Sequence, residues 1–177
     1  MTTTETAILA GGCFWGMQEL IRQLPGVVST RVGYSGGDVP NATYRHHGTH
    51  AEAIEVVFDP ARLSYRQLLA LFFQIHDPTT PNRQGNDVGP QYRSGVYTTL
   101  PGQAADARAV MAELESNKVF DAPLVTEVQP LAAYWPAEDY HQDYYLQHPG
   151  QGYCAFVVGP KVAKFRRQFA GLLKPEA

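Results

Sequence analysis

Residues 8–24, ILAGGCFWGMQELIRQL, place a cysteine between a predicted strand and a predicted helix. The short apolar run Ile8–Ala10 is typical of a strand, and it leads into a glycine pair. Apolar side chains then recur at helical spacing up to Pro25, at Phe14, Met17, Leu20, Ile21 and Leu24. Cys13 is therefore expected at a strand-to-helix turn, where neighbouring glycines let the backbone and a ligand approach closely.

Strands and helices are interleaved along the rest of the sequence. We predict strands at 27–34, 53–59, 96–100 and 124–128, with a further strand-like apolar run at 155–158. We predict helices at 65–76, 103–117, 138–147 and 162–173, and Ser64 with Gln67 forms a capping-box pattern before the first of them. The stretches 36–50 and 78–95 are rich in Gly, Pro and Asn and are expected to be long ordered loops. This order favours an α/β fold, or α+β sandwich, in which helices pack on a sheet.

The composition limits the partners and the compartment. The 177 residues carry a net charge of -3 without a Lys/Arg cluster, so neither nucleic acid nor an anionic membrane is an expected partner. The sequence has no secretion signal at its start and no apolar run near the roughly 18 residues of a membrane-spanning helix. We therefore expect a cytoplasmic monomer with a single domain over residues 1–177.

The two cysteines point to reactive chemistry. Cys13 and Cys154 lie near opposite ends of the chain, which is not the dense spacing of a secreted disulfide framework. A thiol is nucleophilic as thiolate, and the N-terminus of a helix favours that charged form by lowering the pKa. Cys13 is expected in such a position, although a small buried residue at a tight turn explains it equally well from the pattern alone.

Two large aromatic residues, Phe14 and Trp15, follow the cysteine directly. Adjacent residues of a helix lie about 100° apart around its axis, so both side chains cannot point into one core. We expect one of them to line the mouth of a site. An apolar wall of this kind suits a thioether or a methyl group better than a charged group.

Seven motifs follow one another between about Ala7 and Cys154: GGCFWG, GYSGG, NATYRHHGTHAEAI, HDPTT, RQGND, QYRS and a late GYC. In this order they resemble the A-type peptide methionine sulfoxide reductase family. The resemblance implies a central mixed sheet flanked by helices with a ferredoxin-like core. It also implies reduction of the S epimer of methionine sulfoxide, free or in proteins, with thioredoxin as the electron donor and with no metal or other cofactor.

The resemblance assigns roles to residues at matching positions. Cys13 becomes the nucleophile that attacks the sulfoxide sulfur, and Glu52 becomes the acid, which must be buried to hold a proton at neutral pH. The hydroxyl groups of Tyr44 and Tyr92 would hydrogen-bond the sulfoxide oxygen. Phe14 and Trp15 would form the pocket for the S-methyl group, and Asp87 would orient the substrate backbone or a bound water.

Cys154 matches the family's resolving cysteine, which would condense with a Cys13 sulfenic acid to form a disulfide. The sequence after Cys154, AFVVGPKVAKFRRQFAGLL, departs from members whose tail is a glycine-rich coil. Its apolar run and amphipathic pattern suggest an ordered, partly buried tail. Two interpretations stay open: the tail opens locally to deliver Cys154, or Cys154 is structural and an external thiol reduces Cys13.

Three rival interpretations compete with the reductase. The segment HHGTHAE holds His46, His47 and His50 beside Glu52, but the partner ligands of known zinc motifs are absent and a surface loop is favoured. A Cys-His hydrolase would use Cys13 with one of six histidines and would consume no reductant. A non-enzymatic module would grip peptides with Trp15 and the tyrosines, and would tolerate Cys13→Ser.

Overall fold

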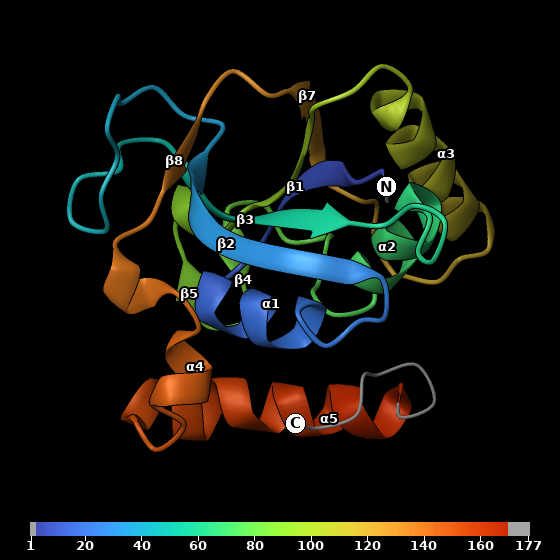
Figure 1. Cartoon of the computed structure of the whole chain (residues 1–177). Coiled ribbons are helices and arrows are strands. Elements are labelled where there is room, and N and C mark those ends of the chain that lie inside the picture. The colour runs from blue at the N-terminus through green and yellow to red at the C-terminus, as the bar shows by residue number, and fades with distance from the viewer. Residues whose placement is uncertain (1–2, 170–177) are drawn as a thin grey trace.

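The computed structural model describes residues 3–169, which fold around a six-stranded mixed sheet (Figure 1). The strand order is β7-β6-β1-β3-β2-β8. These strands are β1 (Glu5–Gly11), β2 (Val27–Ser35), β3 (Ala51–Phe58), β6 (Ser94–Thr98), β7 (Glu127–Pro130) and β8 (Tyr134–Pro136). Neighbouring strands are antiparallel except β6 and β7, which run parallel. The predicted mixed sheet is therefore confirmed.

The centre of the sheet has the predicted ferredoxin-like topology. β1, α1 (Phe14–Ile21), β2, β3, α2 (Tyr65–Phe72) and β6 follow one another as a βαββαβ unit. In the sheet these four strands lie in the order β6-β1-β3-β2. Cys13 lies at the junction of β1 and α1, as the sequence predicts.

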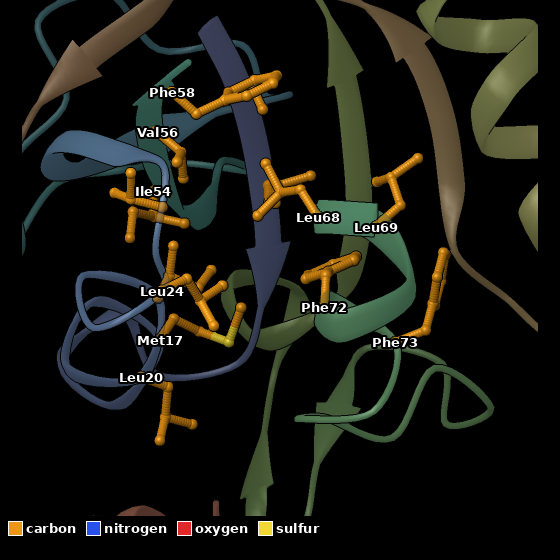
Figure 2. Packing of buried hydrophobic residues seen from close by; sticks show 14 of the residues in the cluster. Met17, Leu20, Leu24, Ile54, Val56, Phe58, Leu68, Leu69, Phe72 and Phe73 are labelled. Carbon is orange, nitrogen blue, oxygen red and sulfur yellow. The ribbon is translucent and has the colours of Figure 1, made fainter. Parts of the chain in front are cut away.

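The main core lies between the sheet and the helices α1 and α2, which cover the same face (Figure 2). Side chains on alternate positions of a strand point to opposite faces of the sheet. Leu9 of β1 therefore joins this core, whereas Ile8 joins a smaller cluster on the opposite face with Tyr97. Figure 2 labels core residues of the two helices and of β3, among them Met17, Leu20, Ile54, Val56, Phe58, Leu68 and Phe72.

The C-terminal helix α5 (Gly159–Gln168) lies against α1 on the side away from the sheet (Figure 1). Its side chains Val162 and Phe165 are buried in the main core. Arg166 Nε donates a hydrogen bond to Gln23 Oε1 over 3.2 Å. The other long helix, α3 (Gln103–Ser116), packs against α2 and β7.

Three predictions for the C-terminal third are corrected. The predicted helix 138–147 is broken into a 3₁₀ turn, Asp139–His141, and α4 (Tyr144–Gln147), because Asp143 takes a left-handed backbone with φ 53°. The strand-like run at 155–158 is wrong, since Cys154–Val158 forms a π-helix that leads directly into α5. The predicted helix 162–173 begins earlier, at Gly159, and its positions 170–173 lie outside the described residues.

Two further elements differ in their bounds: the helix predicted at 65–76 ends at Phe72, and the strand predicted at 124–128 lies at Glu127–Pro130. Ser64 Oγ accepts from the N–H of Gln67, and Gln67 Oε1 accepts from the N–H of Ser64, which completes the capping box of α2. The loop 78–95 is ordered and contains a small hairpin of β4 (Arg83–Gln84) and β5 (Asp87–Val88) that the sequence did not reveal. Across residues 3–169 no helix has the length and apolar character needed to cross a bilayer.

Candidate active site

The predicted site residues gather around one cavity of about 300 Å³ at the N-terminus of α1. Seven of the eight line it: Cys13, Phe14, Trp15, Tyr44, Glu52, Asp87 and Tyr92. Gln151 and Tyr153 complete the lining, and both come from the segment before the π-helix. The eighth predicted residue, Cys154, does not line the cavity.

Cys13 is the N-cap residue of α1 and is half-buried. Hydrogen bonds from the backbone N–H groups of Trp15 and Gly16, and one with Tyr153, lower the pKa of its thiol. Burial and the nearby Glu52 carboxyl outweigh them and raise the pKa of Cys13 to about 12. The helix N-terminus therefore acts on the thiol in the expected direction, but burial decides the net shift of the Cys13 pKa.

Glu52 lies on β3 and is 3% exposed. It shares its face of the strand with Ile54 and Val56 because strand side chains alternate, so it points toward the start of α1. The backbone N–H of Phe14 donates to Glu52 Oε1 over 3.1 Å. Burial, with a smaller contribution from Asp87, raises the pKa of Glu52 to about 8, so the carboxyl holds its proton at neutral pH.

The two aromatic residues after Cys13 have different surroundings, as their helical spacing predicts. Phe14 is buried in a separate cluster with Tyr34, whose ring centroid is 5.6 Å away. Trp15 is half-buried, stacks on Tyr144 at 4.0 Å between centroids and donates from Nε1 to His141 Nδ1 over 3.0 Å. Both rings line the cavity, so its wall beside the thiol is apolar and rigidly held.

Tyr44 and Tyr92 reach the cavity from two different loops. Tyr92 ends a short 3₁₀ helix, Pro90–Tyr92, and Tyr44 lies in the loop between β2 and β3. The backbone N–H of Tyr44 donates to the Glu138 carboxylate. Burial, followed by the charge of Glu52, raises the pKa of both phenols, so both remain hydroxyl donors at neutral pH.

Tyr153 is the main residue of the cavity that the sequence did not single out. Its hydroxyl donates a hydrogen bond to Asp87 Oδ2, and its side chain lines the cavity together with Cys13. Its ring packs edge-on against Trp15, with centroids 6.0 Å apart. The late GYC motif contains this tyrosine, but only the fold brings it to a thiol that lies near the other end of the sequence.

Cys154 is a free thiol with a fully buried side chain. Its backbone N–H donates to Gln151 Oε1 over 3.0 Å, and burial raises its pKa. Cys13 is also a free thiol, so the described state is reduced. The expected ordered and buried tail is present, in helical rather than extended form.

The histidine-rich loop forms no metal cluster. Within the described residues no group of three or more His, Cys, Asp or Glu side chains is placed to hold a metal ion. His50 is buried, with Nδ1 accepting from the N–H of Gly37 and Nε2 facing the carbonyl of Val39 at 2.7 Å. Its role in the fold is therefore to tie the loop 37–50 together.

Comparison with known proteins agrees with this geometry. A family model described as peptide methionine sulfoxide reductase matches residues 5–172. Peptide methionine sulfoxide reductase MsrA 1 of Mesorhizobium japonicum is 62% identical over 156 residues, which cover 88% of this chain and 91% of the relative. MsrA of Mycolicibacterium paratuberculosis is 57% identical over 171 residues, which cover 97% and 99% of the two chains.

A solved structure extends the likeness to three dimensions. Mxr1 of Saccharomyces cerevisiae, in its reduced form, superposes with a TM-score of 0.78 at 31% identity, over 85% of this chain and 89% of Mxr1. The family match covers nearly all of the described residues and includes the whole cavity. The chain therefore belongs to the peptide methionine sulfoxide reductase family.

Proposed function

We propose that this chain reduces the S epimer of methionine sulfoxide to methionine, both free and within proteins, and so repairs oxidised proteins. The observation that carries the proposal is the pairing of a thiol with a protonated carboxyl group in one cavity. Glu52 holds its proton at neutral pH within the cavity that Cys13 lines. Reduction of a sulfoxide by a thiol needs both groups, because the oxygen must be protonated as the sulfur is attacked.

The cavity can bind each part of the substrate with a different group. The aromatic wall of Phe14 and Trp15 suits the S-methyl group. The hydroxyl groups of Tyr44 and Tyr92 donate to the polar sulfoxide oxygen, beside the Glu52 carboxyl. Asp87, at the rim, accepts a hydrogen bond from the backbone of the substrate or from a bound water.

The first chemical step transfers the oxygen to Cys13. The Cys13 sulfur attacks the sulfoxide sulfur while Glu52 protonates the oxygen, and the products are methionine and a Cys13 sulfenic acid. One thiol and one sulfoxide give one thioether and one sulfenic acid, so atoms and electrons balance. The N–H groups of Trp15 and Gly16 stabilise the negative charge that develops on the sulfur.

The second step regenerates the thiol. Cys154 condenses with the sulfenic acid to form a Cys13–Cys154 disulfide and water, and thioredoxin then reduces the disulfide. The solved relative Mxr1 is also known in complex with Trx2, at 24% identity to this chain, so thioredoxin is part of the proposal by likeness. The buried position of Cys154 requires the segment around it to open locally first.

The protein is proposed to act as a cytoplasmic monomer with one domain over residues 1–177. The single mixed sheet and its continuous main core support one folding unit for the described residues. Electrons pass through thiols only, so no metal or organic cofactor is required by this scheme.

Mass spectrometry of the reduced protein tests the proposal. The wild type and Cys154→Ser are each given stoichiometric methionine sulfoxide without an external reductant. We expect methionine from both, a loss of about 2 Da in the wild type and a gain of about 16 Da on Cys13 in the variant.

Each other outcome has a defined meaning. If both proteins stop at the sulfenic acid, Cys154 is structural and an external thiol reduces Cys13. If neither protein forms methionine, the proposed activity is wrong, and the hydrolase and peptide-binding interpretations are tested next.

A further inference from the structure

The guanidinium group of Arg93 joins several segments of the chain. The side chain is 14% exposed, and its Nε donates to Glu127 Oε1 of β7 over 2.8 Å. Its Nη1 donates to two backbone carbonyl groups, those of Thr49 and Pro90, over 2.8 Å each. Its Nη2 donates to the carbonyl of Gly36 over 3.0 Å. One planar group thus ties three backbone segments to one another and to β7.

Two of these segments carry residues of the proposed mechanism. Pro90 begins the 3₁₀ helix that ends at Tyr92, and Thr49 lies just before β3, which carries Glu52. The 3₁₀ helix packs against β3. Because Arg93 Nη1 donates to both carbonyl groups, one nitrogen atom bridges the segment of the tyrosine and the segment of the acid.

The short helix Pro90–Tyr92 has few hydrogen bonds of its own to fix its position. It has three residues, and 3₁₀ helices have poorer hydrogen-bond geometry than α-helices. The N–H of Tyr92 donates to the Gly89 carbonyl over 3.0 Å, and the N–H of Arg93 donates to the Pro90 carbonyl over 3.3 Å. Neither bond reaches β3, whereas the Arg93 side chain links the turn to the segment before that strand.

The proposed mechanism needs Tyr92 and Glu52 at a defined separation. The hydroxyl must donate to the sulfoxide oxygen that the carboxyl protonates, and such a bond forms over about 2.5–3.0 Å between oxygen atoms. Both side chains line the cavity, whereas Arg93 does not. A displacement of about 1 Å at a reacting group lowers a rate by up to about a hundredfold. The link that sets this separation therefore affects the rate as well as the fold.

We propose that Arg93 is a positioning residue that fixes the Tyr92 hydroxyl relative to the Glu52 carboxyl, so that both groups reach the same sulfoxide oxygen. This inference rests on the proposed function. It adds a residue that acts on the reaction through Tyr92 and makes no contact with the substrate.

Arginine suits this role because of the geometry of its donors. The guanidinium group presents five N–H donors in a fixed plane, which here reach a carboxylate and three carbonyl groups. An ammonium group has three donors on one nitrogen atom and cannot reach all four acceptors at once. Arg93→Lys therefore keeps a positive charge near Glu127 but loses the fixed bridge between Thr49 and Pro90.

The test measures methionine formation in a single turnover, by quenched flow at saturating methionine sulfoxide. Tyr44 and Tyr92 donate to the same oxygen in the proposed mechanism, so each hydroxyl can compensate for the loss of the other. Arg93→Lys is therefore combined with Tyr44→Phe, which leaves Tyr92 as the tyrosine donor, and with Tyr92→Phe, which leaves Tyr44. Arg31→Lys, at an exposed arginine that pairs with Glu55 outside the cavity, is the matched control in both backgrounds.

Arg93→Lys is expected to act in one background only. In Tyr44→Phe it should lower the rate of methionine formation about tenfold, because the remaining hydroxyl is displaced from the oxygen. In Tyr92→Phe the fall should be less than about twofold, because the group that Arg93 positions is already absent. Arg31→Lys should change neither rate.

Two results overturn the inference. Similar falls in both backgrounds would show that Arg93 only supports the fold, and no fall in Tyr44→Phe would show that it has no part in the reaction. Normal wild-type turnover with either pattern concerns Arg93 alone. Absence of methionine from the wild type would refute the proposed function and this inference together.

A second variant keeps the test decisive if circular dichroism shows that Arg93→Lys is unfolded. Glu127→Ala removes the ion pair that orients the guanidinium group and leaves the three carbonyl acceptors in place. It should lower the rate about threefold in Tyr44→Phe and leave the rate in Tyr92→Phe unchanged. Equal effects in the two backgrounds, or no effect in either, overturn the inference here as well.

Discussion

Two glutamates on the same strand show how position decides chemistry. Glu55 is partly exposed and pairs with Arg31 at 3.1 Å on one face of β3, whereas Glu52 is 3% exposed and faces α1. A carboxyl group that is removed from water without a cation partner keeps its proton. Burial therefore gives Glu52 the raised pKa that the proposed mechanism requires of its acid.

Glu52→Gln tests this acid directly. The amide keeps the shape and can still accept the N–H of Phe14, but it has no acidic proton. We expect kcat for methionine formation at pH 7 to fall about a hundredfold or more, with KM little changed. Glu55→Gln is the control on the same strand and should retain wild-type kcat, and near-normal turnover in Glu52→Gln would remove Glu52 from the mechanism.

The raised pKa also predicts how stability depends on pH. The carboxyl has a pKa of about 8 when folded and 4.5 as its ordinary value, so the folded protein binds this proton more tightly. Its contribution to stability is complete below pH 4.5 and is lost as the pH rises through 8. The Tm of Glu52→Gln relative to the wild type should therefore rise between pH 5 and pH 8.5, by about 3–6 °C for each pKa unit of the shift. A Tm difference that does not change with pH would contradict the raised pKa.

For single residues, the sequence predicted which residues form the site better than it predicted their pKa values and contacts. The alternation of Glu52 with Ile54 and Val56 is visible in the sequence, and so is the position of Cys13 before a helix. The high pKa of Cys13 could not be read from local sequence, because it depends on burial in the folded site and on Glu52. Tyr153 was missed for the same reason, since its partners are distant along the chain.

At the scale of elements, a helix can be predicted where residues near its ends form a capping motif. Ser64 and Gln67 form such a motif at the start of α2, and their two hydrogen bonds are 2.9 and 3.1 Å long. The run after Cys154 has no such signal, and its short apolar stretch fits a strand and a buried helical turn equally well. Packing against α1 decides between them, which is why the π-helix was not predicted.

Ser64→Ala measures the contribution of the capping box. The change removes the acceptor for the Gln67 N–H at the start of α2, which supplies Leu68 and Phe72 to the core. The free energy of unfolding in urea should fall by about 1 kcal/mol with an unchanged m-value. Ser116→Ala, at the exposed end of α3, should lie within about 0.5 kcal/mol of the wild type. Equal losses in the two variants would show that the cap contributes nothing particular.

At the scale of the whole molecule, the order of the strands in the sheet brings the residues of the site together. The order β6-β1-β3-β2 places β1, which ends at Cys13, beside β3, which carries Glu52. The connection from β1 to α1 then turns the thiol toward that carboxyl. The βαββαβ order of elements is readable from the sequence, but the attachment of the C-terminal helix to α1 depends on contacts between distant residues.

That attachment includes a buried charge. Glu19 is 3% exposed, lies 2.6 Å from Arg22 and is 3.5 Å from Arg166 of α5. A buried carboxylate is stable only with such partners, and a neutral side chain at this position loses the attraction to both guanidinium groups. Because α5 follows the Cys154 segment directly, we expect the Glu19 pair with Arg166 to hold that segment in place as well as the helix.

Glu19→Gln should therefore loosen the C-terminal helix in the intact protein. Under native conditions, the first tryptic cuts within α5, after Lys161, Lys164, Arg166 or Arg167, should be about tenfold faster than in the wild type, because cleavage follows the population of the opened helix. Asp106→Asn, which breaks the exposed pair with Arg66, should leave the rate unchanged. Wild-type cleavage rates in Glu19→Gln would show that the apolar contacts of Val162 and Phe165 alone hold α5 in place.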